Sequence, residues 1–360
     1  MKMPKSLSVL YHGSLVGTLS MTPNNRRCVF EYSQDWLSNG FSISPLELPL
    51  KSGLMLPKTD YFYGDFGIFE DSMPDGYGNY LLNKILQSHG TSLMEMTPVE
   101  RLSIIGSKGM GALEYVPEAT VNIKESPASL DRMQQDALDV LSEKDFTSAE
   151  TLYINSGNSG GCRPKCLWKD DDGSWLVKFR HTYDPLDIGI REYAILKKAK
   201  GCGITVPDFK LFNNKYLGTR RFDISPDGTR LHVATASALL CESIRLPMID
   251  YRRLIRFTAF LTQDMKQAQE MFKRMIFNYE IGNNDDHAKN FSFIFNGEKW
   301  NISPAYDITE CREANHGFHS SLANGKERPT VNDFITIAGD AGLTKRQALN
   351  IIDQIQETLK

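Results

Sequence analysis

The alternation of apolar and polar residues predicts small antiparallel sheets in the first half of the chain. Residues 6–20 alternate around the turn His12-Gly13-Ser14, which is typical of a β-hairpin, and residues 29–32 extend the same pattern. Two further strands are expected at 166–168 and 175–179, joined by a turn at Asp171-Asp172-Gly173, and another strand at 216–223.

Apolar residues at helical spacing predict helices over 71–90, 131–143 and 190–199, the last ending near Gly201. From Thr235 onward the pattern is mostly helical. One helix is expected to stop at Gly282, and its apolar face comprises Ala268, Met271, Phe272, Met275 and Tyr279. The last helix is expected to open at Thr344 with a capping box and to bury Ala348, Ile351, Ile352 and Ile355.

A sheet-rich half before a helical half predicts an α+β, two-lobed fold with a ligand held between the lobes. Residues 116–129 contain Pro117, Pro127 and several polar residues and are the best candidate for a linker. We therefore expect three parts: an N-terminal subdomain (1–120), a nucleotide-binding lobe (121–234) and a helical lobe (235–360).

Composition and charge narrow the class of protein. The chain has 360 residues, of which 41% are hydrophobic and 24% charged, and a net charge of −3, so no global positive field attracts nucleic acid or anionic lipid. No apolar run approaches a membrane span, and the N-terminus lacks a secretory signal. Six cysteines are scattered without paired C-x-x-C spacing, which favours reduced thiols over a zinc site. A cytoplasmic protein without a membrane partner is expected.

The candidate chemistry begins with Asp285, which stands five residues before Asn290 and is followed by Asp307. This order suits ATP-dependent phosphoryl transfer, in which a carboxylate aligns the attacking hydroxyl and two oxygen ligands hold Mg²⁺. Between Asn290 and Asp307, residues 291–295 and 300–303 flank Asn296-Gly297, a signal for a two-residue hairpin. Such a hairpin would bring both ligands to one ion.

Each of these residues alone fits a plain turn or a cap equally well, whereas the set of three with a hairpin between them favours the catalytic interpretation. His287 and Lys289 lie in the same loop. For these two, contact with phosphate and a loop-bracing role remain equal alternatives.

A glycine-rich turn at residues 156–165 precedes the strand expected at 166–168. Glycines there allow backbone N–H groups to approach phosphate oxygens. Lys178 lies on the following strand, on the side opposite Trp175, Val177 and Phe179, and is expected to pair with the α- and β-phosphates. Glu192 opens the next helix and is the natural ion-pair partner of that lysine. An exposed edge-strand lysine and a first-turn glutamate are the alternatives.

With these residues assembled, the chain resembles the HipA family of serine/threonine kinases, the toxin half of HipA–HipB toxin–antitoxin modules. Residues 161–165 are similar to the family's GxRPK phosphate loop, residues 285–290 to its D-x-H-x-K-N catalytic loop, and residues 304–307 to its P-x-Y-D metal motif. The N-terminal part, through 48–50 and 69–75, resembles the family's N-terminal subdomain.

The resemblance implies a protein-serine kinase that uses ATP and Mg²⁺, with Asp285 and Lys178 catalytic and Asn290 and Asp307 binding the metal. It implies that nucleotide is bound by Gly160, Gly161, Cys162, Arg163, Lys165, Lys178, Phe222, Asp223, His287 and Lys289. It also implies growth arrest or persistence through phosphorylation of a protein, with aminoacyl-tRNA synthetases as known substrates of the family. The implied partners are a HipB-like helix-turn-helix antitoxin and, mainly through it, operator DNA.

One position departs from the family pattern. The regulatory serine that precedes the GxRPK loop is replaced by Asn158, which leaves Ser159 as the candidate autophosphorylation site. Two other functions stay open at this point: a small-molecule phosphotransferase with the same Asp–Asn–Asp logic, and a non-catalytic scaffold of a DNA-bound repressor.

Overall fold

The computed structural model describes residues 3–119, 128–156, 160–243 and 249–360. The chain divides into two compact units, the first made of residues 1–189 and 210–232 and the second of residues 190–209 and 233–360. The chain passes between the units at helix α7 (Ile188–Gly201) and at strands β7 (Phe209–Phe212) and β9 (His232–Thr235). The expected three-part division of the chain stays a prediction.

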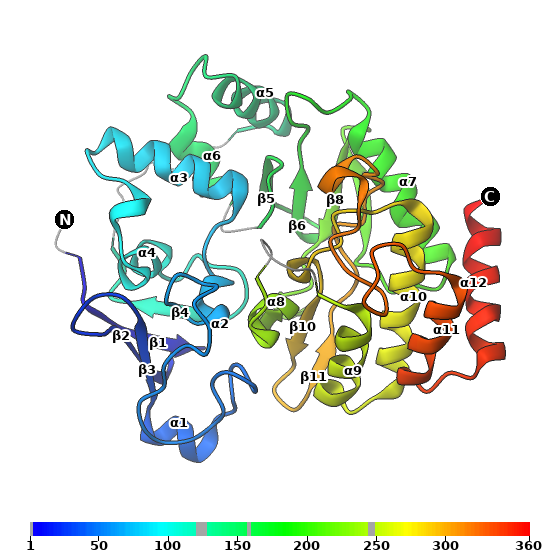
Figure 1. Cartoon of the computed structure of the whole chain (residues 1–360). Helices are drawn as coiled ribbons and strands as arrows, with labels where there is room; N and C mark the ends of the chain where they lie inside the picture. Colours follow the sequence, from blue (N-terminus) through cyan, green and yellow to red (C-terminus); the bar gives the residue numbers. More distant parts are fainter. Residues whose placement is uncertain (1–2, 120–127, 157–159, 244–248) are drawn as a thin grey trace. The chain divides into compact units, whose positions relative to one another are not determined.

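The first unit begins with a four-stranded antiparallel sheet in the order β3-β2-β1-β4 (Figure 1). Its strands are β1 (Ser6–Tyr11), β2 (Ser14–Met21), β3 (Cys28–Tyr32) and β4 (Leu113–Val116). His12 and Gly13 link β1 to β2 with φ values of 48° and 76°, the backbone that a tight hairpin turn requires. The predicted hairpin and its third strand are therefore confirmed.

Short helices occupy the chain between β3 and β4. They are α1 (Gln34–Asn39), α2 (Gly67–Glu70), α3 (Gly76–Ser88), a 3₁₀ turn (Leu93–Glu95) and α4 (Pro98–Ile105). The prediction of a single helix over 71–90 was wrong about where the helix begins. Helix α3 begins at Gly76 because the Asp75 carboxylate accepts a hydrogen bond from the Gly76 N–H (2.8 Å) and so caps the helix there.

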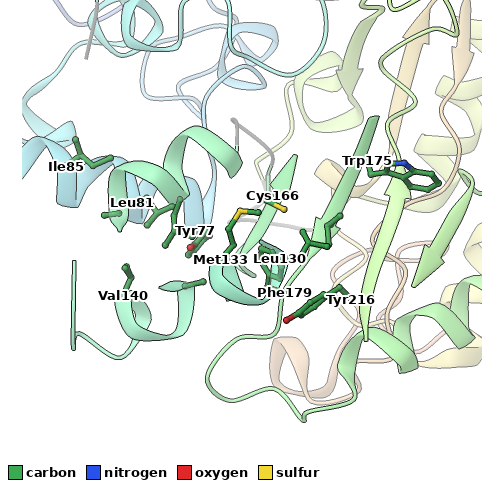
Figure 2. Close-up of a cluster of buried hydrophobic side chains, with 14 residues drawn as sticks. Tyr77, Leu81, Ile85, Leu130, Met133, Val140, Cys166, Trp175, Phe179 and Tyr216 are labelled. Carbon is green, nitrogen blue, oxygen red and sulfur yellow. The ribbon is translucent and has the colours of Figure 1, made fainter. Parts of the chain in front are cut away.

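The second half of this unit packs helices against a sheet of order β5-β6-β8-β7. Its remaining elements are α5 (Leu130–Leu141), α6 (Ala149–Ser156), β5 (Lys165–Asp170), β6 (Gly173–Lys178) and β8 (Tyr216–Arg220). Figure 2 shows their shared core, to which Leu81 of α3, Met133 of α5 and Cys166 of β5 contribute buried side chains. The predicted strands and α5 are confirmed, except that the strand predicted over 216–223 ends at Arg220. Helix α6 was missed, because its apolar residues are not gathered on one face.

The second unit is mostly helical, as predicted. Its elements are α8 (Ala236–Leu240), α9 (Tyr251–Thr262), α10 (Met265–Ile281), a 3₁₀ turn (Ala288–Asn290), β10 (Ser292–Phe295), β11 (Trp300–Ile302), a second 3₁₀ turn (Ala314–Gly317), α11 (Val331–Asp340) and α12 (Lys345–Leu359). Helix α10 is the central helix, because it contacts α9, α11 and α12 (Figure 1). Its inward side chains include Met271, Phe272 and Met275, each fully buried.

Two local predictions for this unit had different outcomes. The capping box at Thr344 is present, and the Thr344 hydroxyl accepts a hydrogen bond from Gln347 N. The two-residue turn predicted at Asn296-Gly297 was wrong: Phe295 pairs with Trp300, so residues 296–299 form a four-residue loop. The Asn296 side chain accepts hydrogen bonds from the backbone N–H groups of residues 298 and 299, and it thereby fixes the longer turn.

Small antiparallel sheets combined with many helices confirm the predicted α+β class. Among the helices of the described residues, none combines the length and the apolar character needed to cross a bilayer.

Candidate active site

The predicted catalytic loop leaves the end of α10 at a glycine that no other residue could replace easily. Gly282 caps the helix with a φ of 70°, in the left-handed region. A Cβ at this position would lie 2.6 Å from Cγ of Arg312, which packs directly over the turn. Conformation and close approach both require glycine, so the direction in which residues 283–290 leave the helix is fixed.

Two adjacent aspartates in this loop have opposite environments. The Asp285 side chain is 54% exposed, whereas the Asp286 side chain is fully buried. The Asp286 carboxylate accepts hydrogen bonds from the Tyr251 hydroxyl (2.8 Å) and from Ser321 N (3.1 Å), and it lies 3.2 Å from Nδ1 of His319. Asp286 therefore braces the loop from inside, whereas the Asp285 side chain is exposed to solvent.

The brace continues into α9 and α10. The Asn278 amide donates to the Tyr251 hydroxyl (2.8 Å), and the Asn283 amide donates to Oδ1 of Asn278 (3.1 Å). Burial, followed by the neighbouring Asp286 carboxylate, holds the pKa of Tyr251 well above its usual range. The phenol therefore keeps its proton and acts as a donor to Asp286.

Asn290 is oriented by the same loop. Its side-chain amide nitrogen donates to the backbone carbonyl of Asp285 (2.8 Å), and its backbone N–H donates to the carbonyl of His287 (2.9 Å). Because the amide nitrogen is used inside the loop, the Oδ1 oxygen is the atom that can bind a cation.

Tyr306 joins the predicted metal motif to the catalytic loop. Its hydroxyl donates to the carbonyl of Lys289 (2.6 Å) and lies 2.6 Å from the Ser292 hydroxyl. These two contacts fall on either side of Asn290. Asp307 follows Tyr306 directly and has a positive φ of 55°, which is unusual for a residue other than glycine. The segment that carries Asp307 is therefore fastened beside Asn290.

The start of the metal motif is held separately. The buried Arg274 guanidinium donates to the carbonyl of Ser303 (2.7 Å) and contacts Glu270 (3.3 Å). The backbone N–H of Ala305 donates to the carbonyl of Thr205 (2.8 Å). Two independent attachments thus keep residues 303–307 in place without any ligand.

The donor set in this part of the second unit fits Mg²⁺ better than a softer metal. Among the described residues, no three His, Cys, Asp or Glu side chains gather as a metal site. Mg²⁺ is usually held by one or two protein oxygens together with substrate phosphates and water. One oriented amide oxygen and one carboxylate are consistent with that mode.

The predicted phosphate loop lies in the first unit, on the first turn of α3. Gly161 has a φ of 96°, and its carbonyl accepts a hydrogen bond from Tyr77 N (3.1 Å). A Cβ on Gly76 would lie 2.8 Å from both Cα of Cys162 and the Gly161 carbonyl oxygen. The loop therefore approaches the helix too closely for any side chain at Gly76.

Two lysines lie opposite one another in the adjoining sheet. Lys165 on β5 pairs in register with Lys178 on β6, so both side chains leave the same face. Trp175, Val177 and Phe179 are buried on the opposite face, in agreement with the predicted alternation. The Lys165 ammonium also donates to the carbonyl of Gly160.

Arg163, predicted to bind nucleotide, is engaged within its own unit. Its guanidinium makes a two-pronged contact with the Asp184 carboxylate (3.0 and 3.1 Å), which also accepts a hydrogen bond from His181 N (2.8 Å). The buried Asp184 thus fixes the position of the phosphate loop relative to the end of β6.

Asp223, like Arg163, makes hydrogen bonds within the first unit. Its carboxylate binds the Arg221 guanidinium and accepts a hydrogen bond from Gly111 N (3.2 Å). Burial is the largest single influence on the pKa of Asp223 and raises it. The hydrogen bonds and positive charge of Arg221, together with backbone hydrogen bonds that include the one from Gly111, outweigh burial and leave the pKa below its ordinary value. Phe222 is half-buried beside it. A nucleotide contact by either residue stays a prediction.

The remaining predicted residues are placed as follows. Lys178 lies in the first unit, whereas Glu192 is buried in α7 within the second, so their pairing stays a prediction. Nε2 of His287 lies 3.9 Å from Oδ1 of Asp285, which suits a loop-bracing role. Ser159, like Asn158, lies outside the described residues.

Sequence reasoning missed the residues that hold the catalytic loop from behind. Tyr251, His319 and Ser321 are each more than 30 residues from Asp286 along the chain, and they occur in no motif. Tyr306 belongs to the P-x-Y-D motif, but the motif alone did not indicate that its hydroxyl contacts the neighbouring loop.

Two family profiles together cover most of the chain. The profile of the HipA N-terminal domain matches residues 7–116, and that of the HipA-like C-terminal domain matches residues 157–360. The fold is similar to that in the Shewanella oneidensis MR-1 complex of HipA, HipB and operator DNA, with a TM-score of 0.73, 19% identity and coverage of 97% of this chain and 88% of that one.

Two curated relatives share shorter stretches. "Putative kinase Y4dM" of Sinorhizobium fredii is 27% identical over 154 residues, 38% of this chain, and a "Putative kinase" of Haemophilus influenzae is 33% identical over 76 residues, 21% of this chain. The matches span only 37% and 22% of those two relatives.

The fold is kinase-like and belongs to the α+β class. More narrowly, the chain belongs to the HipA family, whose C-terminal profile alone covers more than half of it.

Proposed function

We propose that this chain is an ATP- and Mg²⁺-dependent protein serine/threonine kinase that acts as the toxin of a toxin–antitoxin module. Membership of the HipA family and two relatives described as kinases support the reaction class. The observation that carries the proposal is the Tyr306 clamp, which fastens the Asp307 segment to the loop bearing Asp285 and Asn290.

Each side chain then has a defined task. Asp285, exposed at the tip of a braced loop, accepts the hydrogen bond of the incoming hydroxyl and aligns the oxygen for attack. Asn290 and Asp307 hold the metal ion through one neutral and one charged oxygen. Bound Mg-ATP supplies the transferable phosphoryl group and the charge neutralisation around it.

The first unit contributes the phosphate grip. Gly160, Gly161 and Cys162 present the backbone of the loop that rests on α3, and Lys165 and Lys178 present two ammonium groups from one face of the sheet. Arg163 positions this loop through Asp184. The lysines neutralise phosphate charge, and Glu192 orients Lys178.

We also propose the partners that the family implies. The Shewanella oneidensis protein was solved with HipB and operator DNA, which supports a HipB-like helix-turn-helix antitoxin and, mainly through it, operator DNA. The acceptor is a cytoplasmic protein such as an aminoacyl-tRNA synthetase, and its phosphorylation arrests growth.

Labelled ATP added to cell extract tests the proposal. Wild-type protein should transfer label to a protein band, and Asp285→Ala should reduce that transfer by roughly 10²–10⁴-fold. Asp307→Ala should additionally lose metal-dependent nucleotide binding. Label in the small-molecule fraction would favour a small-molecule phosphotransferase. Absence of Mg-ATP binding together with tight binding of a helix-turn-helix partner would favour a scaffold.

A further inference from the structure

A pocket of about 290 Å³ opens in the second unit beside the predicted catalytic loop. One wall consists of Tyr279 and Gly282 at the end of α10 and Asn284 in the loop itself. The opposite wall comes from the segment 312–329. All of this pocket lies within described residues, and none of the residues assigned above to metal or phosphate binding lines it.

The pocket is joined directly to the residue before Asp285. The Asn284 side chain donates to the carbonyl of Arg312 (2.7 Å), and the Asn315 side chain donates to the carbonyl of Asn284 (2.7 Å). The pocket wall therefore includes the residue that directly precedes Asp285 in the chain.

The chemistry of the lining favours an anion with an apolar stem. The lining includes two arginines, Arg312 and Arg328, and one acidic residue, Glu327. The Arg328 guanidinium lies 5.2 Å from the centre of the Phe318 ring, and this contact keeps the cation beside an apolar surface. A planar carboxylate matches the fork of an arginine, and the carbons behind it can pack on the ring.

The existing contacts of Arg312 leave it able to bind a ligand, since its Nη2 makes only a long contact with the carbonyl of Glu280 (3.5 Å). Arg312 has an ion pair with Glu310 at 3.2 Å, but both side chains are about 60% exposed, so the pair is screened by water and easily exchanged. His319 also lines the pocket and contacts the buried Asp286 on its other side. The pocket thus connects to the brace of the catalytic loop.

We propose that this pocket binds an acidic side chain of the polypeptide acceptor, and the proposal rests on the kinase function proposed above. A volume of about 290 Å³ accommodates one or two side chains rather than a second nucleotide. Because Asn284 of the pocket wall directly precedes Asp285, the acidic residue should lie within a few positions of the phosphorylated serine.

A positional-scanning library of serine peptides, labelled by the full-length chain with ATP, tests this assignment. The wild type is compared with the double variant Arg312→Gln/Arg328→Gln and with the single variant Arg328→Gln. The single variant leaves the packing of Arg312 on Gly282 intact. The double variant Lys345→Gln/Arg346→Gln removes the same charge from the exposed start of α12 and is the matched control. Hydrolysis of ATP without acceptor is measured in every preparation.

Wild type and the matched control should select Asp or Glu at one position near the serine. The pocket variants should lose that selection, and their KM for the chosen acceptor should rise roughly 10- to 100-fold with the KM for ATP unchanged. Normal ATP hydrolysis without acidic selection, or an unaltered acceptor KM in Arg312→Gln/Arg328→Gln, would overturn the pocket assignment alone. Absence of label transfer from ATP to any protein or peptide by the wild type would overturn the kinase proposal and the pocket assignment with it.

Discussion

Replacing Tyr306 by phenylalanine should weaken the binding of Mg-ATP while leaving the aromatic packing unchanged. The substitution removes the hydroxyl that contacts the Lys289 carbonyl and the Ser292 hydroxyl, each at 2.6 Å. A hydrogen bond of this kind contributes about 0.5–1.5 kcal/mol, so the loss is about 1–3 kcal/mol. If that loss is expressed in ligand binding, the Kd for Mg-ATP rises roughly 5- to 150-fold.

Isothermal titration calorimetry with ATP, in the presence and absence of Mg²⁺, measures this effect. The weakening should appear only with Mg²⁺ present, because the clamp holds the segment that carries Asp307. Ser292→Ala removes one of the two contacts and should give a smaller change in the same direction. A Tyr306→Phe protein that binds Mg-ATP with wild-type affinity would refute the role of the clamp.

Two further predictions concern stability in the first unit. The buried Tyr77 hydroxyl has no hydrogen-bond partner among the described residues. Tyr77→Phe should therefore raise the free energy of unfolding, measured by urea titration, by about 1 kcal/mol or more. A loss of stability in this variant would contradict the prediction. Burial raises the pKa of Asp65 to about 8, and the negative charge of the nearby Glu70 carboxylate is the second-largest cause. The folded state therefore holds a proton that the unfolded chain releases near pH 4, and stability should fall by about 1.4 kcal/mol per pH unit as the pH rises from 4 to 8. Asp65→Asn should remove this component, and identical pH profiles for variant and wild type would be incompatible with a protonated Asp65.

Elements with a strong local signal could be predicted from the sequence. The first hairpin was predictable because His12-Gly13 supplies two residues that tolerate positive φ. The end of α10 was predictable because Gly282 is a left-handed cap, and the last helix because Thr344 and Gln347 form a capping box. In each case the information lies within a few consecutive residues.

Elements decided by distant contacts could not be predicted in the same way. Helix α6 packs on α3 and α5, yet its own apolar residues do not form a stripe. The turn after β10 became a four-residue loop because the Asn296 side chain binds two backbone N–H groups, a choice that the Asn-Gly pair alone does not reveal.

In the candidate site, too, the features set by nearby residues could be predicted and those set by distant contacts could not. The spacing of Asp285, Asn290 and Asp307 pointed to phosphoryl transfer from the sequence alone. The sequence could not predict that Asp285 is exposed and Asp286 buried, because two identical adjacent residues do not show which of them faces the interior. The difference comes from Tyr251, which approaches Asp286 from α9.

The most direct test of the account compares Asp285→Asn with wild type in two assays on the same preparations. The asparagine keeps the shape of the side chain but removes the carboxylate that aligns the acceptor hydroxyl. Mg-ATP should bind with near wild-type affinity, whereas phosphoryl transfer to protein in cell extract should fall by roughly 10²–10⁴-fold. Transfer at the wild-type rate by Asp285→Asn would contradict the central claim that this loop performs phosphoryl transfer.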